Sequence, residues 1–222
     1  MTIPLFNRIG FEPKLVLFDL DGTLLDSLPD LYAASVSMAH SLNIMGPSLH
    51  QVEQWVGNGA GVLVQRILAN QCQPPATDPP LDIALQLFME AYLQLGNRQS
   101  RLYDGVEVLL GELHQSGIRQ GVITNKPSQF TQPLLLQFGI LHYFDLVFAG
   151  DTFAEKKPHP MPLLKAAQQL GFRVEECLMI GDSSNDINAA KACGMPCAGV
   201  RGGYNHGRDI AECEPDWVLG CL

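Results

Sequence analysis

Positive charge is scarce in this sequence. Its 222 residues include 14 Lys and Arg against 23 Asp and Glu, so the formal net charge, 14 − 23, is −9. Proteins that bind nucleic acid present a basic face to the phosphate backbone, and this balance argues against such a partner. Long-range attraction of anionic substrates is not expected from the net charge either.

Membrane-spanning runs, targeting signals and a cysteine framework are also lacking. No apolar stretch approaches the roughly 18–20 residues that cross a bilayer, and the N-terminus has no basic segment followed by an apolar one. The six cysteines are too few and too scattered for a disulfide scaffold. We therefore expect a cytoplasmic protein with no membrane partner, long enough to bury a core without staples.

Short apolar runs alternate with helical patterns along much of the chain. The runs have the composition of strands buried on both faces of a parallel sheet. They lie at 15–18, 121–123, 146–149, 177–180 and 197–200. Helical patterns between them stop at glycines such as Gly171, and Asp104 is placed to cap one of them. This alternation predicts an α/β fold with a Rossmann-like, doubly wound parallel sheet.

One long insertion interrupts this alternation after the first strand. About 75 residues between Ser27 and Tyr103 contain no good strand run. Helical patterns occur there at 28–42, 62–68 and 81–95, with a proline-rich loop at 73–80. We predict a catalytic core of residues 1–26 and 104–222 and an all-α cap domain of residues 27–103, with Ser27 as a hinge or helix cap.

The sharpest local feature is Asp19-Leu20-Asp21-Gly22-Thr23, directly after the first apolar run. Carboxylates at positions i and i+2 of an extended segment point to the same side, and open α/β sheets bind ligands at the carboxyl ends of their strands. Such neighbouring charges repel unless a cation or a proton intervenes. The alternative is a solvated turn that caps the next helix.

Three further strand ends carry polar groups. They are Thr124-Asn125-Lys126, Lys156-Lys157-Pro158-His159-Pro160 and Gly181-Asp182-Ser183-Ser184-Asn185-Asp186. Carboxylates from two strand ends can hold Mg²⁺, whereas a hydroxyl and an ammonium group can hold a phosphoryl group. Together they predict phosphoryl transfer.

In order and spacing these segments resemble the four motifs of the haloacid dehalogenase superfamily. The resemblance covers essentially the whole chain, and the helical insertion lies where that family's first cap domain lies. Residues 55–60, 150–160 and 203–207 add a likeness to phosphatases of the family. The resemblance implies Mg²⁺-dependent hydrolysis of a small phosphomonoester through an aspartyl-phosphate, with 2-phosphoglycolate as the expected substrate.

The resemblance also implies residue roles. Asp19 would be the nucleophile and Asp21 the general acid and base. Mg²⁺ would be held by Asp19, the backbone carbonyl of Asp21 and Asp182. An acid at position 21 suits an alcohol leaving group, which favours phosphomonoester hydrolysis over carbon–halogen cleavage.

The remaining implied roles concern the phosphoryl group. Thr124 and the backbone amide of Asn125 would bind its oxygens, and Lys157 would neutralise developing charge. Asp186 would act behind these residues by orienting Lys157 or the water shell of the metal.

Substrate recognition by the cap is less defined. Gly57, Asn58 and Gly59 form either a nest of backbone amides for the substrate carboxylate or a plain helix start. Cationic candidates for the same task are Arg66, Arg98, Arg101 and Arg201, which the sequence does not rank.

Three other functions compete with hydrolysis. A sugar-phosphate mutase would share the aspartyl-phosphate. A nucleotide-binding oxidoreductase would need a third Gly or Ala where Val62 stands, as well as a preceding strand. A non-catalytic binding protein would be expected to have lost part of the motif set. The oligomeric state does not follow from the sequence.

Overall fold

A parallel sheet forms the centre of the core in the computed structural model, which describes residues 3–70 and 80–222. Its strand order is β5-β4-β1-β6-β7-β8, and each neighbouring pair is parallel. The strands are β1 (Leu15–Phe18), β4 (Arg119–Ile123), β5 (Leu146–Phe148), β6 (Cys177–Gly181), β7 (Cys197–Val200) and β8 (Trp217–Leu219). The expected α/β parallel sheet is confirmed, and β1 at its centre is buried throughout.

Helices cover both faces of this sheet. Alternate residues of a strand point to opposite faces, so Val16 and Phe18 pack in one apolar cluster while Leu15 and Leu17 pack in another. The first cluster includes residues of α1 (Pro4–Ile9), α6 (Val106–Gln115) and α7 (Ser128–Gln137). The second includes residues of α8 (Met161–Leu170) and α9 (Ser184–Cys193). The sheet is therefore doubly wound, as predicted.

The ends of the helices agree with only some of the capping and stop residues predicted from the sequence. Helix α8 is followed by Gly171, which has a left-handed φ of 77°, as expected of a glycine that ends a helix. The prediction that Asp104 caps α6 is wrong, because α6 begins after Gly105 and no side chain caps it. Short 3₁₀ turns lie at η1 (Leu141–Tyr143), η2 (Val174–Glu176) and η3 (Ile210–Cys213).

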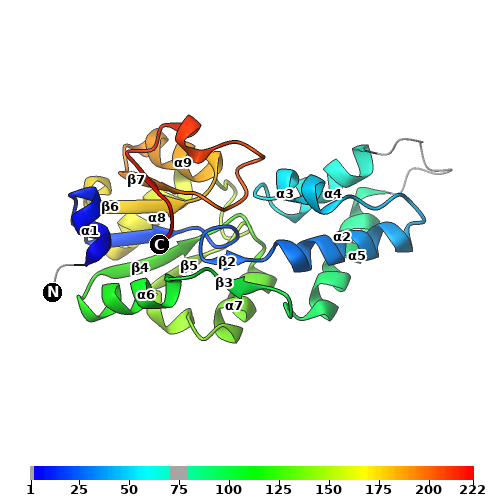
Figure 1. Cartoon of the computed structure of the whole chain (residues 1–222), viewed down its shortest axis with the longest axis horizontal. Coiled ribbons are helices and arrows are strands. Elements are labelled where there is room, and N and C mark those ends of the chain that lie inside the picture. The colour runs from blue at the N-terminus through cyan, green and yellow to red at the C-terminus, as the bar shows by residue number, and fades with distance from the viewer. Residues whose placement is uncertain (1–2, 71–79) are drawn as a thin grey trace.

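The insertion folds into a separate helical layer at one end of the molecule (Figure 1). Its helices are α2 (Leu28–Ser41), α3 (Leu49–Trp55), α4 (Ala60–Ala69) and α5 (Leu81–Leu95). They enclose their own apolar cluster, which includes Met38, Val64 and Phe88. Helix α3 was not predicted, although the spacing of Ser48 and Gln51 forms a capping box that could have signalled it. Apart from Pro80, the predicted loop at 73–80 lies outside the described residues.

Two very short strands join the helical layer to the core. Strands β2 (Leu25–Asp26) and β3 (Arg101–Leu102) pair antiparallel. The expectation of no strand in the insertion is wrong at Arg101–Leu102, where two residues are too few to show a pattern. Ser27 precedes α2, but its side chain does not cap that helix. Among the described residues, no helix combines the length and apolarity needed to cross a membrane.

Candidate active site

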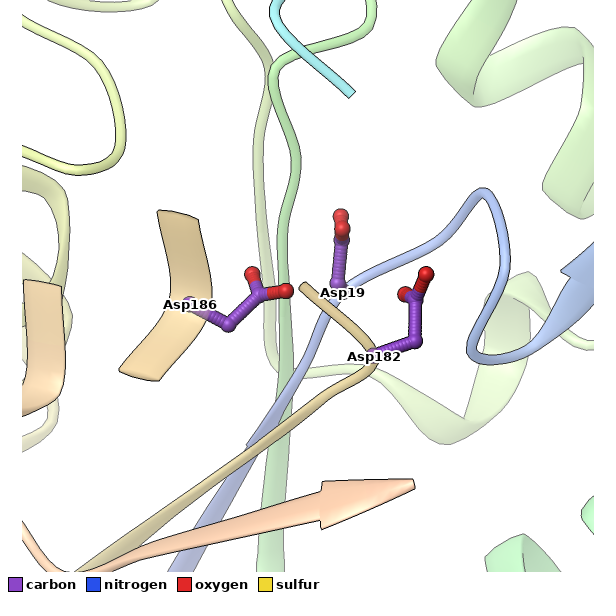
Figure 2. Close-up of side chains that lie close together, drawn as sticks. All are labelled: Asp19, Asp182 and Asp186. Atoms are coloured by element: carbon purple, nitrogen blue, oxygen red, sulfur yellow. The ribbon is translucent and has the colours of Figure 1, made fainter. Parts of the chain in front are cut away.

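Three acidic side chains meet at the carboxyl edge of the sheet. Asp19 follows β1, Asp182 follows β6, and Asp186 lies in the first turn of α9. Figure 2 shows these side chains close together at the ends of their elements. One carboxylate oxygen of each lies within 4.8 Å of those of the other two, and all three residues are buried. Adjacent parallel strands thus bring together residues more than 160 positions apart.

Burial makes this acidic cluster electrostatically unfavourable on its own. The pKa of Asp19 is raised to about 7, mainly by burial; Lys157 offsets part of this effect and Asp186 adds to it. The pKa of Asp182 is raised well above its ordinary value, first by burial and then by repulsion from Asp186 and Asp19. Hard divalent cations prefer oxygen ligands, so the donor set and its uncompensated charge fit a divalent metal ion.

Two loops fix the position of Asp182. Its Oδ1 accepts a hydrogen bond from the Thr23 hydroxyl at 2.6 Å, and its Oδ2 accepts one from the Tyr204 amide at 2.7 Å. Gly22 has a φ of 90° and lies so close that an added Cβ would overlap the Asp182 carboxylate. A glycine is thus required at position 22 both by the backbone conformation and by the proximity of the Asp182 carboxylate.

Lys157 lies between two of the carboxylates. Its Nζ is 2.9 Å from Asp19 Oδ1 and 2.6 Å from Asp186 Oδ1, and it also donates to the Ile123 carbonyl. Burial favours the neutral amine, but Asp186 and Asp19 outweigh this effect and raise the Lys157 pKa. Asp186 is itself held by the amide and hydroxyl of Ser183, at 3.0 and 2.8 Å. Asp186 therefore orients an ammonium group that stays charged.

Thr124 and Asn125 follow β4 and line the same cavity as Asp19. The Thr124 amide donates to the Phe148 carbonyl at 2.9 Å, which extends the pairing of β4 with β5. Asn125 Nδ2 donates to the Lys157 carbonyl at 2.8 Å and to the Gly57 carbonyl at 3.0 Å. Asn125 thus connects the core to the loop before α4.

Residues 57–59, the glycine-rich segment of the insertion, lie only partly in the cavity. Gly57 and Gly59 line the cavity, and Gly59 immediately precedes α4. The side-chain oxygen of Asn58 instead accepts a hydrogen bond from Asn185 Nδ2 at 2.7 Å, and its carbonyl accepts one from Lys156 Nζ at 2.9 Å. Asn58 is therefore held by residues of the core.

The arginine candidates lie elsewhere. Arg66 donates to the Trp55 carbonyl, Arg101 pairs with Asp26, and Arg201 pairs with Asp209. Within the described residues, none of these arginines lines the cavity that contains Asp19, and neither does Arg98.

Sequence reasoning missed a second buried lysine. Lys126 Nζ lies 3.1 and 3.2 Å from the two carboxylate oxygens of Asp21, and it donates to the Tyr92 hydroxyl at 2.9 Å. The Ser27 hydroxyl also donates to Asp21, at 2.6 Å. The position of Lys126 directly after Thr124 and Asn125 could have identified it as a site residue. Tyr92 fits the apolar face of a helix, so nothing in the sequence pointed to a role in the site.

The two sides of the cavity differ in chemistry. Its core side presents Asp19, Asp21, Thr124, Asn125 and Lys126, together with the apolar residues Pro127 and Phe130. Its helical side is lined mainly by apolar residues, which are Leu31, Val56, Ala60, Leu63 and Phe88, together with Tyr92. A charged reacting group would therefore be held by the core and enclosed by the insertion.

This fold and site define a class of hydrolase. Residues 16–200 match the model of the haloacid dehalogenase-like hydrolases, and the chain belongs to that family. Individual members of the family are similar to it over nearly their full length. The chain is 42% identical over 211 residues to the phosphoglycolate phosphatase of Nitrosococcus oceani, which covers 95% of this chain and 94% of the relative. It is 47% identical over 207 residues to the phosphoglycolate phosphatase of Vibrio cholerae, with 92% of each covered.

A solved structure agrees over nearly the full length. The crystal structure of a predicted phosphoglycolate phosphatase from Haemophilus somnus superposes with a TM-score of 0.90 at 37% identity, and 94% of each chain is covered. The resemblance to the haloacid dehalogenase superfamily is thereby confirmed.

Proposed function

We propose that this protein is a Mg²⁺-dependent phosphatase that hydrolyses 2-phosphoglycolate to glycolate and phosphate. The observation that carries the proposal is the buried cluster of Asp19, Asp182 and Asp186 beside the charged Lys157. The shared name of the Nitrosococcus and Vibrio relatives supports the choice of substrate. The net charge of −9 is consistent with a small substrate, because positive charge is then needed only locally.

The metal would be held by Asp19, Asp182 and the backbone carbonyl of Asp21. A bound Mg²⁺ would neutralise the carboxylates and screen them from the anionic phosphate. Mg²⁺ in particular is part of the proposal, whereas the acidic cluster itself suits any hard divalent cation.

In the first step, a carboxylate oxygen of Asp19 attacks phosphorus and the bond from phosphorus to the ester oxygen breaks. Asp21 donates a proton to that oxygen, which leaves as the hydroxyl of glycolate. Thr124 and the Asn125 amide bind phosphoryl oxygens, and Lys157 opposes their negative charge. Asp186 keeps Lys157 in place through the 2.6 Å contact.

In the second step, water attacks the phosphorus of the aspartyl-phosphate while Asp21 accepts its proton. The bond to Asp19 breaks, which restores both carboxyl groups to their starting states. Residues 27–103, acting as a cap domain, exclude bulk water and limit the size of the leaving group through the apolar side of the cavity.

A panel of phosphate esters tests this proposal. Purified protein would be assayed for phosphate release from 2-phosphoglycolate, sugar phosphates and nucleotides, with Mg²⁺ and with the metal chelated. We expect Mg²⁺-dependent release with the highest kcat/KM on 2-phosphoglycolate. A higher value on a sugar phosphate or nucleotide would reject the substrate, and isomerised sugar without phosphate release would indicate a mutase instead.

A further inference from the structure

The buried pair of Lys126 and Tyr92 is the part of the cavity that the proposed chemistry leaves unused. Lys126 lies in the loop after β4 of the core, whereas Tyr92 lies on α5 of the insertion. The Lys126 side chain is 4% exposed, and its Nζ also lies 4.6 Å from the centre of the Tyr92 ring. The Tyr92 ring packs edge-on against Phe130, at 4.9 Å between centroids. Both polar groups are therefore fixed by packing.

Lys126 is the one amine among the described residues that line this cavity, which also contains Asp19 and Asp21. Lys157 and Lys156 are not part of this lining: Lys157 contacts Asp19, Asp186 and the Ile123 carbonyl, and Lys156 donates to the carbonyl of Asn58. A substrate carboxylate would meet two protein carboxylates on entering. It needs a cation, because a buried unpaired charge is strongly unfavourable.

The length of the substrate selects the position of that cation. In 2-phosphoglycolate a single methylene group separates the ester oxygen from the carboxylate. If Asp21 protonates the ester oxygen, the substrate carboxylate lies beside Asp21, and Lys126 Nζ is 3.1 Å from Asp21 Oδ1. None of the candidate arginines lines this cavity, so none is placed to bind so short a molecule.

The hydrogen-bonding pattern provides two donors there. The Tyr92 oxygen accepts from Lys126 Nζ, which leaves the hydroxyl hydrogen to donate elsewhere. Burial raises the Tyr92 pKa, so the hydroxyl keeps that hydrogen. An ammonium and a phenol side by side are a suitable pair for a carboxylate.

We infer that Lys126 and Tyr92 bind the carboxylate of the substrate and set the preference for carboxylate-bearing phosphate esters. This inference rests on the proposed function. Gly57 and Gly59 then close the cavity without supplying the charge.

Two substrates that differ at one end test the inference, since ethyl phosphate has a methyl group where 2-phosphoglycolate has a carboxylate. The quantity measured is the ratio of kcat/KM for 2-phosphoglycolate to that for ethyl phosphate. Lys126→Met should lower this ratio by about 10- to 150-fold, the value of a hydrogen bond to a charged group. Any effect of the substitution on Asp21 changes kcat/KM for both substrates alike and therefore cancels in the ratio. Lys156→Met, which removes the same charge next to the cavity, should keep the ratio within about twofold of wild type.

Tyr92→Phe provides a second variant that retains the pair of Lys126 and Asp21 and the aromatic packing. It should lower the ratio by less than Lys126→Met does, with thermal stability close to wild type. The same comparison can be made without turnover by measuring calorimetrically the binding of two phosphonates, 3-phosphonopropionate with a carboxylate and propylphosphonate without one. Lys126→Gln replaces Lys126→Met if the latter does not fold.

The outcomes separate this inference from the proposed function. An unchanged ratio in the Lys126 and Tyr92 variants, with wild type preferring 2-phosphoglycolate, overturns the inference alone. Equal hydrolysis of both esters by wild type also overturns it, while the phosphatase activity stands. Release of phosphate from neither ester rejects the proposed function itself.

Discussion

The two sides of the cavity are built on opposite principles. On the core side, Asp19 lines the cavity, and behind it lie Asp182, Asp186 and Lys157; these ionisable groups are buried and bonded to one another or to neighbouring residues. On the helical side, residues such as Leu63 and Phe88 are apolar and belong to a separate cluster. Charges aimed at a reacting group need a rigid frame, which the sheet provides, whereas apolar walls need only the correct shape. Under the proposed function, the core supplies the chemistry, while the insertion, together with Lys126 of the core, selects the substrate.

The largest expected effect comes from removing the nucleophile on the core side. Asp19→Asn keeps the size of the side chain but cannot form the aspartyl-phosphate, so kcat should fall by at least about 10⁴-fold. The measurement is phosphate release, with circular dichroism to verify the fold. Substantial activity in this variant would reject Asp19 as the nucleophile.

Removing the central cation tests how strongly the core side depends on its charge balance. Lys157→Met leaves Asp19 and Asp186 without their buried partner. We expect kcat to fall by about 10²–10³-fold and the free energy of unfolding to drop by about 3–5 kcal/mol. Denaturant unfolding with and without Mg²⁺ would measure the second effect. Wild-type stability in the metal-free variant would contradict the role of Lys157 in balancing this cluster.

A truncation on the helical side should alter selection more than chemistry. Leu63 is 3% exposed and lines the cavity. Leu63→Ala should leave kcat on 2-phosphoglycolate within about tenfold of wild type while raising relative kcat/KM for bulkier esters, at a stability cost of about 2–5 kcal/mol. A loss of kcat as large as that of Lys157→Met would remove the distinction between the two sides.

The smallest effect is expected at an exposed ion pair far from the cavity. A hydrogen bond from Lys14, with further contributions from Arg173, lowers the pKa of Glu176 from 4.5 to about 2. A depressed folded-state pKa means that this contribution is complete above pH 4.5 and is lost as pH falls toward 2. The difference in thermal midpoint between wild type and Glu176→Gln should therefore shrink across this window, with activity unchanged at pH 7. A difference that grows toward low pH would contradict this sign.

The sequence was informative where the fold itself brings residues together. Parallel strands end at one edge of a sheet, so Asp19, Thr124 and Asp182 could be placed near one another from the sequence alone. The contact between Lys126 and Tyr92 could not, because it depends on how α5 packs over the core. Strand β3 has two residues and shows no periodicity. Ser27 stood at a helix start, yet its hydroxyl binds Asp21 in the tertiary structure.

The stereochemical course at phosphorus tests the central claim most directly. A thiophosphate ester made chiral with two oxygen isotopes would be hydrolysed in water carrying the third, and the configuration of the released thiophosphate determined. Attack by Asp19 followed by attack of water gives two in-line displacements, so the account predicts overall retention of configuration. Inversion would show a single direct attack by water and would contradict the account.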